Sequence, residues 1–334
     1  MTRKSLFGRR RMMIFGHDFH SSRLSWRWWE IILFLLLLLF SIPSIVVVDA
    51  AAEISTSKIP IIDLAPWTRI DPHVEQDGLD DTERLEVVHH IRTACETVGF
   101  FLIQNHGFDP YVAQQAWDVT RTFFQLDAMT KLRYKTTNET EYPYGYEQSE
   151  QLTKGKALDD DTDFREFREM KHGRSYGTAD RKETFAIGPN NVRSGMPMRR
   201  WPSEKHPIPH LHEALDMYYD QMDRLSRRIL RLFALAMNQS PDFFDDKMDH
   251  HMSALRLVHY YPIDPPLNQT EVVRAGAHTD YGAVTILNAH DRGLQILLYD
   301  DDNKTSSQWY PVPVVRDTLI INLGDLMQRW TNGT

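Results

Sequence analysis

The stretch Arg274-Ala-Gly-Ala-His-Thr-Asp-Tyr-Gly282 places a histidine and a carboxylate two residues apart, at His278 and Asp280. Residues at positions i and i+2 of a β-strand point to the same side of the backbone. At the mouth of a strand, this imidazole and this carboxylate can therefore hold two neighbouring coordination positions of one metal ion. The tripeptide alone is a weak signal, because a surface histidine beside a solvated aspartate in a turn has the same sequence.

Short apolar segments around this stretch predict an antiparallel β-structure. Ala254–Pro262 alternates apolar and polar residues and ends at a proline, which is the pattern of a strand. Further short strands separated by Gly, Asp and Asn turns are expected at Ala283–Leu287, Leu294–Tyr299, Trp309–Val314 and Thr318–Leu323. No long helical pattern lies between them. This succession is typical of an antiparallel barrel or jelly roll.

Three helices are expected to flank this core. Thr82 can cap a helix through Val98, whose apolar stripe would be Leu85, Val88, Ile91, Cys95 and Val98, and Gly99 would end it. A second helix is expected from Pro110 to Phe124. The third has one apolar stripe over Leu215–Ala236, which predicts a packing face against the sheet. The predicted fold class is mainly β with α, a jelly-roll core flanked by helices.

Several longer motifs extend the match beyond the His–Asp pair. They are I-P-I-I-D-L (Ile59–Leu64), A-C-E-T-V-G-F-F-L-I-Q-N-H-G-F (Ala94–Phe108), L-R-L-V-H-Y-Y-P (Leu255–Pro262), R-A-G-A-H-T-D-Y-G-A-V-T-I-L (Arg274–Leu287), G-L-Q (Gly293–Gln295), W-Y-P-V-P (Trp309–Pro313) and N-L-G-D-L-M-Q-R-W-T-N-G (Asn322–Gly333). In this order and spacing they resemble the isopenicillin N synthase-like Fe(II)/2-oxoglutarate-dependent dioxygenases. The resemblance covers residues 59–334. Such enzymes hold Fe(II) with two histidines and one carboxylate on one face of the metal.

The resemblance implies a role for several residues. His278 and Asp280 would be iron ligands, and Tyr261 would contact the carboxylate of 2-oxoglutarate. His259 stands where the family often has an asparagine, so it is either a residue packed inside the barrel or a working group. The implied cofactors are Fe(II) and 2-oxoglutarate, with ascorbate used by some relatives. The implied reaction uses dioxygen to oxidise a C–H bond of a small organic molecule by hydroxylation, desaturation or ring closure.

The resemblance also implies parts that this sequence lacks. The distal histidine ligand, and the arginine and serine that grip the co-substrate, are expected beyond Thr334. The chain is therefore interpreted as a fragment of a dioxygenase, and the absent strand is expected to leave an unpaired sheet edge. The alternative is a catalytically inactive, membrane-tethered jelly-roll module.

Composition is that of an ordinary globular chain, with 42% hydrophobic and 25% charged residues and a net charge of −8. Basic residues gather in the first 30 positions, so the body of the chain is acidic, which argues against a nucleic-acid surface. Cys95 is the single cysteine. It allows no internal disulfide, and a buried thiol is expected there.

Ile31–Val48 is an uncharged run of 18 residues and predicts a transmembrane signal-anchor. Basic residues precede it and acids follow it, so residues 1–30 would be a cytosolic tail and the catalytic domain would be lumenal, in the endoplasmic reticulum or Golgi. Two alternatives are a cleaved signal, with Val48-Asp-Ala50 as cleavage site, and a wrongly joined first exon on a cytoplasmic enzyme. After this run, an N-terminal dioxygenase region is expected at 59–207. A helix with an incomplete jelly-roll core is expected at 208–334.

Glycosylation motifs favour the secretory route. Five asparagines begin an N-x-[ST] sequon, at Asn138, Asn238, Asn268, Asn303 and Asn332. Each alone is only a motif match. Asn238 is a poor acceptor because Pro241 follows it closely. Together the sequons support the prediction of a lumenal domain.

Overall fold

The computed structural model describes residues 12–15, 58–68, 81–135, 144–148, 182–190, 201, 208–262, 273–299 and 307–332. The predicted span Ile31–Val48 lies outside these residues, as do the sequons at Asn138, Asn268 and Asn303. Within the ranges just given, no helix has the length and apolar character needed to cross a membrane.

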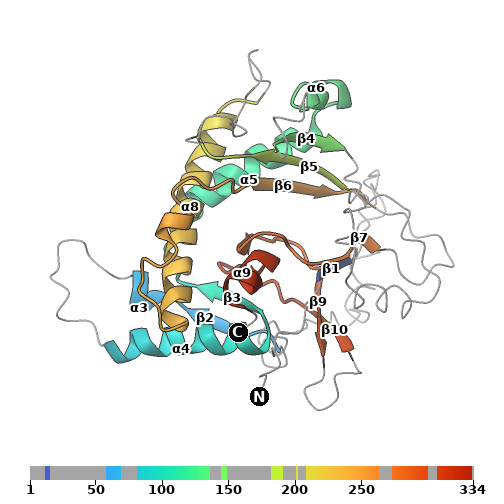
Figure 1. The fold of residues 1–334 in the computed structure, drawn as a ribbon. Helices are drawn as coiled ribbons and strands as arrows, with labels where there is room; N and C mark the ends of the chain where they lie inside the picture. Colours follow the sequence, from blue (N-terminus) through green and yellow to red (C-terminus); the bar gives the residue numbers. More distant parts are fainter. Residues whose placement is uncertain are drawn as a thin grey trace, which may run out of the picture.

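The strands form three sheets (Figure 1). The first has the order β10 (Ser307–Pro311), β9 (Leu294–Tyr299), β1 (Met12–Phe15) and β7 (Val273–His278). The second has the order β2 (Ile61–Asp63), β3 (Phe100–Gln104), β11 (Leu319–Leu323) and β8 (Val284–Leu287). The third has the order β4 (Gly145–Gln148), β5 (Lys182–Ile187) and β6 (Leu255–Tyr260). The predicted strands after residue 254 are confirmed, and the mainly β class with them.

Helices cover the sheets from outside. They are α3 (Ala65–Thr68), α4 (Asp81–Thr97), α5 (Pro110–Gln125), α6 (Ala128–Leu132), α8 (Leu211–Ala236), α9 (Asp325–Trp330) and the short 3₁₀ helix η3 (Asp245–Lys247). In Figure 1, α8 runs from the β4–β5–β6 sheet down to α4, while α9 lies near the centre. Helix α5 begins with Pro110 after Asp109, whose side chain accepts a hydrogen bond from the Tyr111 amide. This is a favourable helix start, because it satisfies an otherwise free N–H.

The long helix α8 supplies the predicted packing face. Its C-terminal half places Ile229 and Phe233 in a buried cluster with Phe101 and Ile321 of the second sheet. Its N-terminal half packs Leu215 and other side chains against α5 and the third sheet. One helix therefore joins the two sheets through apolar contact.

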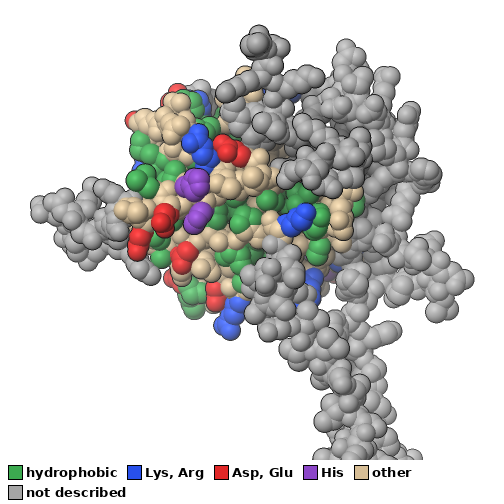
Figure 2. All heavy atoms as spheres, turned by 90° about the horizontal axis from the view of Figure 1, so that it is seen from below, with side chains coloured by type: hydrophobic (Ala, Val, Ile, Leu, Met, Phe, Trp, Pro, Cys, Tyr) green, Lys and Arg blue, Asp and Glu red, His purple; other side chains and the backbone are tan. Residues whose placement is uncertain are grey.

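The apolar face of α4 differs from the prediction. Val87, Ile91 and Ala94 are buried, whereas Leu85 is 67% exposed. The buried positions follow the i, i+4, i+7 spacing of one helix face, and Leu85 lies off that face. The underside of the molecule in Figure 2, where α4 lies, accordingly mixes hydrophobic, acidic, basic and histidine side chains.

Strand β1 joins the core from far upstream in the sequence. It runs antiparallel to both neighbours, with Met12 opposite His278 of β7 and opposite Ile296 of β9. The facing edges of β7 and β9 are thus both paired with β1. Residues 12–15 belong to the region predicted as a separate cytosolic tail, so that region contributes a strand to the sheet.

The packing of α8 gives a stability prediction. Phe233 is 3% exposed and meets Phe101 edge-on at 6.3 Å between ring centroids. Phe233→Ala should lower the free energy of unfolding by about 3–5 kcal/mol, because it leaves a cavity in the core. Met217→Ala, on the same helix but 50% exposed, should change it by less than about 0.5 kcal/mol. Urea denaturation measures both, and equal effects would contradict this packing.

Candidate metal centre

The structure brings His278 and Asp280 together at the end of β7. The Nε2 atom of His278 lies 3.6 Å from Oδ1 of Asp280, and their side chains are 26% and 21% exposed. Two ligands about 2.1 Å from one ion and at right angles to each other would lie about 3 Å apart. A small adjustment would therefore let both atoms bind one metal ion.

The ring of His278 is oriented for metal binding. Its Nδ1 lies 2.8 Å from the carbonyl oxygen of Gly276. A carbonyl oxygen can only accept, so Nδ1 carries the proton and donates it. The Nε2 lone pair is then free to bind a metal, and such a backbone contact is the usual way to fix a ligating histidine.

Two further residues orient the carboxylate of Asp280. Its Oδ2 accepts hydrogen bonds from Thr285 Oγ1 at 2.6 Å and from Asn322 Nδ2 at 2.8 Å. Thr285 and Asn322 are paired across β8 and β11. Because they occupy Oδ2, Oδ1 is left facing His278. Sequence analysis missed both residues, and the only signal was that they lie inside matching motifs.

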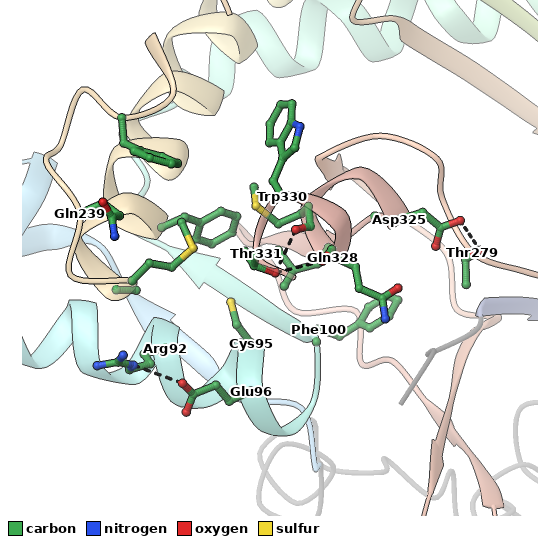
Figure 3. Close-up of a pocket in the computed structure, with 18 residues that line it drawn as sticks. Arg92, Cys95, Glu96, Phe100, Gln239, Thr279, Asp325, Gln328, Trp330 and Thr331 are labelled. Atoms are coloured by element: carbon green, nitrogen blue, oxygen red, sulfur yellow. Dashed lines mark hydrogen bonds and ion pairs between the residues drawn. The ribbon is translucent and has the colours of Figure 1, made fainter. Parts of the chain in front are cut away.

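The start of α9 holds the turn that carries the metal-binding pair. The Asp325 amide donates to the Asp280 carbonyl at 2.8 Å, and Thr279 Oγ1 donates to Asp325 Oδ2 at 3.1 Å (Figure 3). At Gly324 a Cβ atom would lie 2.0 Å from the carbonyl oxygen of Gly282. Only glycine permits this close approach of the two backbones.

The described residues supply two ligands and no third. They contain no group of three His, Cys, Asp or Glu side chains suited to a metal. His290, the next histidine along the chain, stacks on Trp117 of α5 with ring centroids 3.9 Å apart. An imidazole and a carboxylate nonetheless match the donor set expected for non-haem iron.

Tyr261 directly follows β6. Its ring centroid is 5.6 Å from that of His259. Burial raises the pKa of Tyr261, and nearby Glu183 raises it further. The phenol is therefore protonated at neutral pH and can donate to a carboxylate. His259, whose role the sequence left open, is not packed in an apolar core, because its Nδ1 contacts a carboxylate oxygen of Glu183 at 2.8 Å.

A separate cavity of about 320 Å³ lies between α4, α8 and α9. Cys95 and Trp330 line it together with other apolar side chains (Figure 3). Cys95 is partly exposed, so the expectation of a fully buried thiol is wrong. Thr279 and Asp325 line the cavity, but His278 and Asp280 do not. This cavity thus borders the metal-binding turn through Thr279, while His278 and Asp280 do not line it.

A β-sheet core that carries a paired imidazole and carboxylate defines a class, the non-haem metal-dependent oxygenases. Two family models match the chain, non-haem dioxygenase in morphine synthesis N-terminal at residues 59–204 and 2OG-Fe(II) oxygenase superfamily at residues 252–334. Homoarginine-6-hydroxylase 2-ODD-233 of Oryza sativa subsp. japonica is 31% identical over 283 residues, which are 82% of this chain and 77% of that protein. The 2-oxoglutarate-dependent dioxygenase caaD of Aspergillus niger is 27% identical over 281 residues, which are 83% and 76% of the two chains.

Solved structures agree with these relatives. A full-length Neurospora crassa protein in complex with alpha-KG and thymine has a TM-score of 0.60 and 26% identity, covering 82% of this chain and 76% of that one. The chain belongs to the isopenicillin N synthase-like 2-oxoglutarate-Fe(II) dioxygenase family. It is accordingly a 2-oxoglutarate-dependent dioxygenase, an oxidoreductase whose cofactors are Fe(II) and 2-oxoglutarate.

The bonds to Oδ2 of Asp280 give a prediction on metal affinity. Thr285→Val and Asn322→Ala should each weaken Mn(II) binding about 10- to 100-fold, because a freed carboxylate no longer presents Oδ1 to the ion. Thr331→Val is the control, since Thr331 Oγ1 donates to the α9 carbonyls of Met327 and Gln328. Calorimetric titration measures all three. Unchanged affinity in Thr285→Val and Asn322→Ala would refute this orienting role.

The close approach at Gly324 gives a second prediction. Gly324→Ala should lower both the thermal midpoint and the Mn(II) affinity, because the added Cβ pushes α9 away from the metal-binding turn. At Gly282 an added Cβ would meet only the Val284 carbonyl oxygen, at 3.9 Å. Gly282→Ala should therefore be tolerated. If the two variants behaved alike in thermal melts and metal titrations, the contact between α9 and the metal-binding turn would contribute neither to stability nor to metal affinity.

Proposed function

We propose that this chain forms most of the catalytic domain of an enzyme that oxidises a C–H bond of a small organic molecule. Membership of the dioxygenase family and the geometry of His278 and Asp280 support the proposal. The single observation that carries it is that each side chain has one atom held by the protein and the other free for metal. The outcome, whether hydroxylation, desaturation or ring closure, belongs to the proposal as well.

Each residue of the site has a definite task in this proposal. His278 Nε2 and Asp280 Oδ1 would hold Fe(II), while Thr285 and Asn322 keep the carboxylate from turning. The protonated phenol of Tyr261 would donate to the 2-oxoglutarate carboxylate. Bound Fe(II), with 2-oxoglutarate and dioxygen, supplies an oxidant strong enough for C–H bonds, and the protein supplies orientation and exclusion of water. Ascorbate would be the alternative electron source.

The third iron ligand, a histidine, and the arginine that would bind 2-oxoglutarate are proposed to lie beyond Thr334. A guanidinium suits a bidentate carboxylate contact, and metal affinity depends on the number of ligands. A second candidate is the inactive module, and one observation favours it. The described residues offer only two metal ligands.

Succinate formation separates the two candidates. The 334-residue chain with Fe(II), 2-oxoglutarate and ascorbate should produce little succinate, because its described residues supply two metal ligands instead of three. A chain continued through the next strand of the transcript should produce succinate, and His278→Ala should abolish it. Strong turnover by the short chain would mean that its own residues supply the third ligand. No turnover in either form would favour the inactive module.

The position of strand β1 bears on the predicted membrane topology, in which Ile31–Val48 crosses once and the catalytic domain is lumenal. Met12–Phe15 pairs with β7 and β9, so these residues and the core must lie on the same side of any membrane. A single crossing at Ile31–Val48 with a lumenal core would place them on opposite sides. The proposed single-pass topology therefore requires that β1 leave the sheet.

Carbonate extraction, protease protection and glycan analysis of the expressed full chain decide whether β1 stays in the sheet or the segment Ile31–Val48 crosses a membrane once. If β1 stays in the sheet, as the structure has it, the protein should not resist carbonate extraction as a single-pass protein does. A protease added to intact microsomes should then find residues 12–15 and the core equally protected or equally accessible. A core glycosylated at Asn138, Asn268 or Asn303 with a protease-accessible N-terminus would show that β1 leaves the sheet and that the segment crosses once.

A further inference from the structure

A buried carboxylate with three hydrogen-bond donors lies in the β4–β5–β6 sheet, outside the metal centre. Glu183 is 1% exposed. Its Oε2 accepts from Lys131 Nζ at 2.7 Å and from Tyr146 Oη at 2.6 Å, and its Oε1 lies 2.8 Å from His259 Nδ1. Lys131 and Tyr146 are themselves buried, whereas the His259 side chain is 40% exposed. One carboxylate oxygen therefore contacts the buried Lys131 and Tyr146, and the other contacts the half-exposed ring of His259.

The protonation of this cluster follows from its contacts. Burial alone would raise the pKa of Glu183, but the hydrogen bonds from Lys131, Tyr146 and His259 outweigh it, and the pKa is lowered. Burial, reinforced by Glu183, raises the pKa of Tyr146, so its phenol keeps the proton. Glu183 is thus ionised at neutral pH. An ionised carboxylate can only accept, so Nδ1 of His259 must carry a proton and donate it.

The proton on Nδ1 determines the hydrogen-bonding role of Nε2, the other ring nitrogen of His259. In the neutral ring, a protonated Nδ1 leaves Nε2 as a hydrogen-bond acceptor. Phe124 and Tyr261 flank the ring at 5.3 and 5.6 Å between centroids. An imidazole held on one side by a carboxylate and open on the other is the arrangement by which proteins aim a histidine at a ligand.

We propose that Glu183 is a positioning residue that fixes His259 as the Nδ1–H tautomer, so that Nε2 accepts a hydrogen bond from an O–H or N–H group of the substrate. The inference rests on the proposed function and narrows its substrate to small molecules that carry such a donor. The buried Lys131 balances the charge of Glu183 and, with Tyr146, occupies Oε2, which leaves Oε1 to His259.

Ring-nitrogen NMR of the metal-free full chain, labelled with ¹⁵N-histidine, tests the tautomer. The His259 signals, assigned by their loss in His259→Gln, should show a protonated Nδ1 and an unprotonated Nε2 at neutral pH. Tyr146→Phe, which removes the hydrogen bond from Tyr146 to Oε2 and leaves Oε1 to His259, should leave this pattern unchanged. Glu183→Gln should shift the ring toward the Nε2–H tautomer, because an amide can also donate to Nδ1.

Loss of the Glu183 charge leaves Lys131 buried without a counter-ion, so Glu183→Gln can fail to fold. Glu183→Gln combined with Lys131→Met removes both charges and keeps the comparison possible. The wild-type spectrum needs neither variant. An Nε2–H tautomer, or a freely exchanging ring, in the wild-type protein would overturn the proposal whatever the variants do.

Steady-state kinetics with a substrate that the enzyme turns over test whether His259 accepts a hydrogen bond from that substrate. His259→Phe should raise KM about tenfold with little change in kcat, and His259→Gln, whose amide oxygen can accept, should restore most of the affinity. A KM unchanged by His259→Phe would overturn the substrate contact. The NMR result does not depend on iron or turnover, so failure of the proposed dioxygenase activity can be told apart from failure of this inference.

Discussion

The contact between the start of α9 and the turn after β7 determines the geometry of the metal centre. Gly324 lies so close to Gly282 that no side chain fits between the two backbones. This approach lets the Asp325 amide reach the Asp280 carbonyl and lets Asn322, two residues before Gly324, reach the Asp280 carboxylate. The strand β11 that carries Asn322 is held by β3 and by the apolar face of α8. Helix packing thus fixes the orientation of one carboxylate oxygen.

The side chains that are proposed to bind metal or substrate share one pattern of polar contacts. His278, Asp280 and His259 each use one side-chain atom for a protein partner and leave another atom available to a ligand. In each case the partner lies on a strand or in the strand's own backbone, where it costs little further ordering. This division prepares ligand-binding atoms before any ligand is present, which reduces the entropy lost on binding.

Much of the core and the metal-binding pair was predictable from local sequence. The H-x-D spacing predicts two side chains on one side of a strand, and the structure brings them together. Asn322 was not predictable as a partner of Asp280, because 42 positions separate them and strand pairing alone brings them together. Leu85 looked like part of an apolar stripe, but tertiary packing chose another face of α4. Strand β1 was missed because a short apolar segment in a basic tail gives no sign of which sheet edge it pairs with.

Metal titration tests most directly whether His278 and Asp280 form the metal centre. Mn(II) replaces Fe(II) here because it binds the same oxygen and nitrogen donors and resists oxidation. The 334-residue chain should show one saturable site that is lost in His278→Ala and in Asp280→Ala, and binding there should be weak because the described residues supply only two ligands. His290→Ala should keep the site, since that ring stacks on Trp117. Saturable binding retained in both His278→Ala and Asp280→Ala would contradict the account.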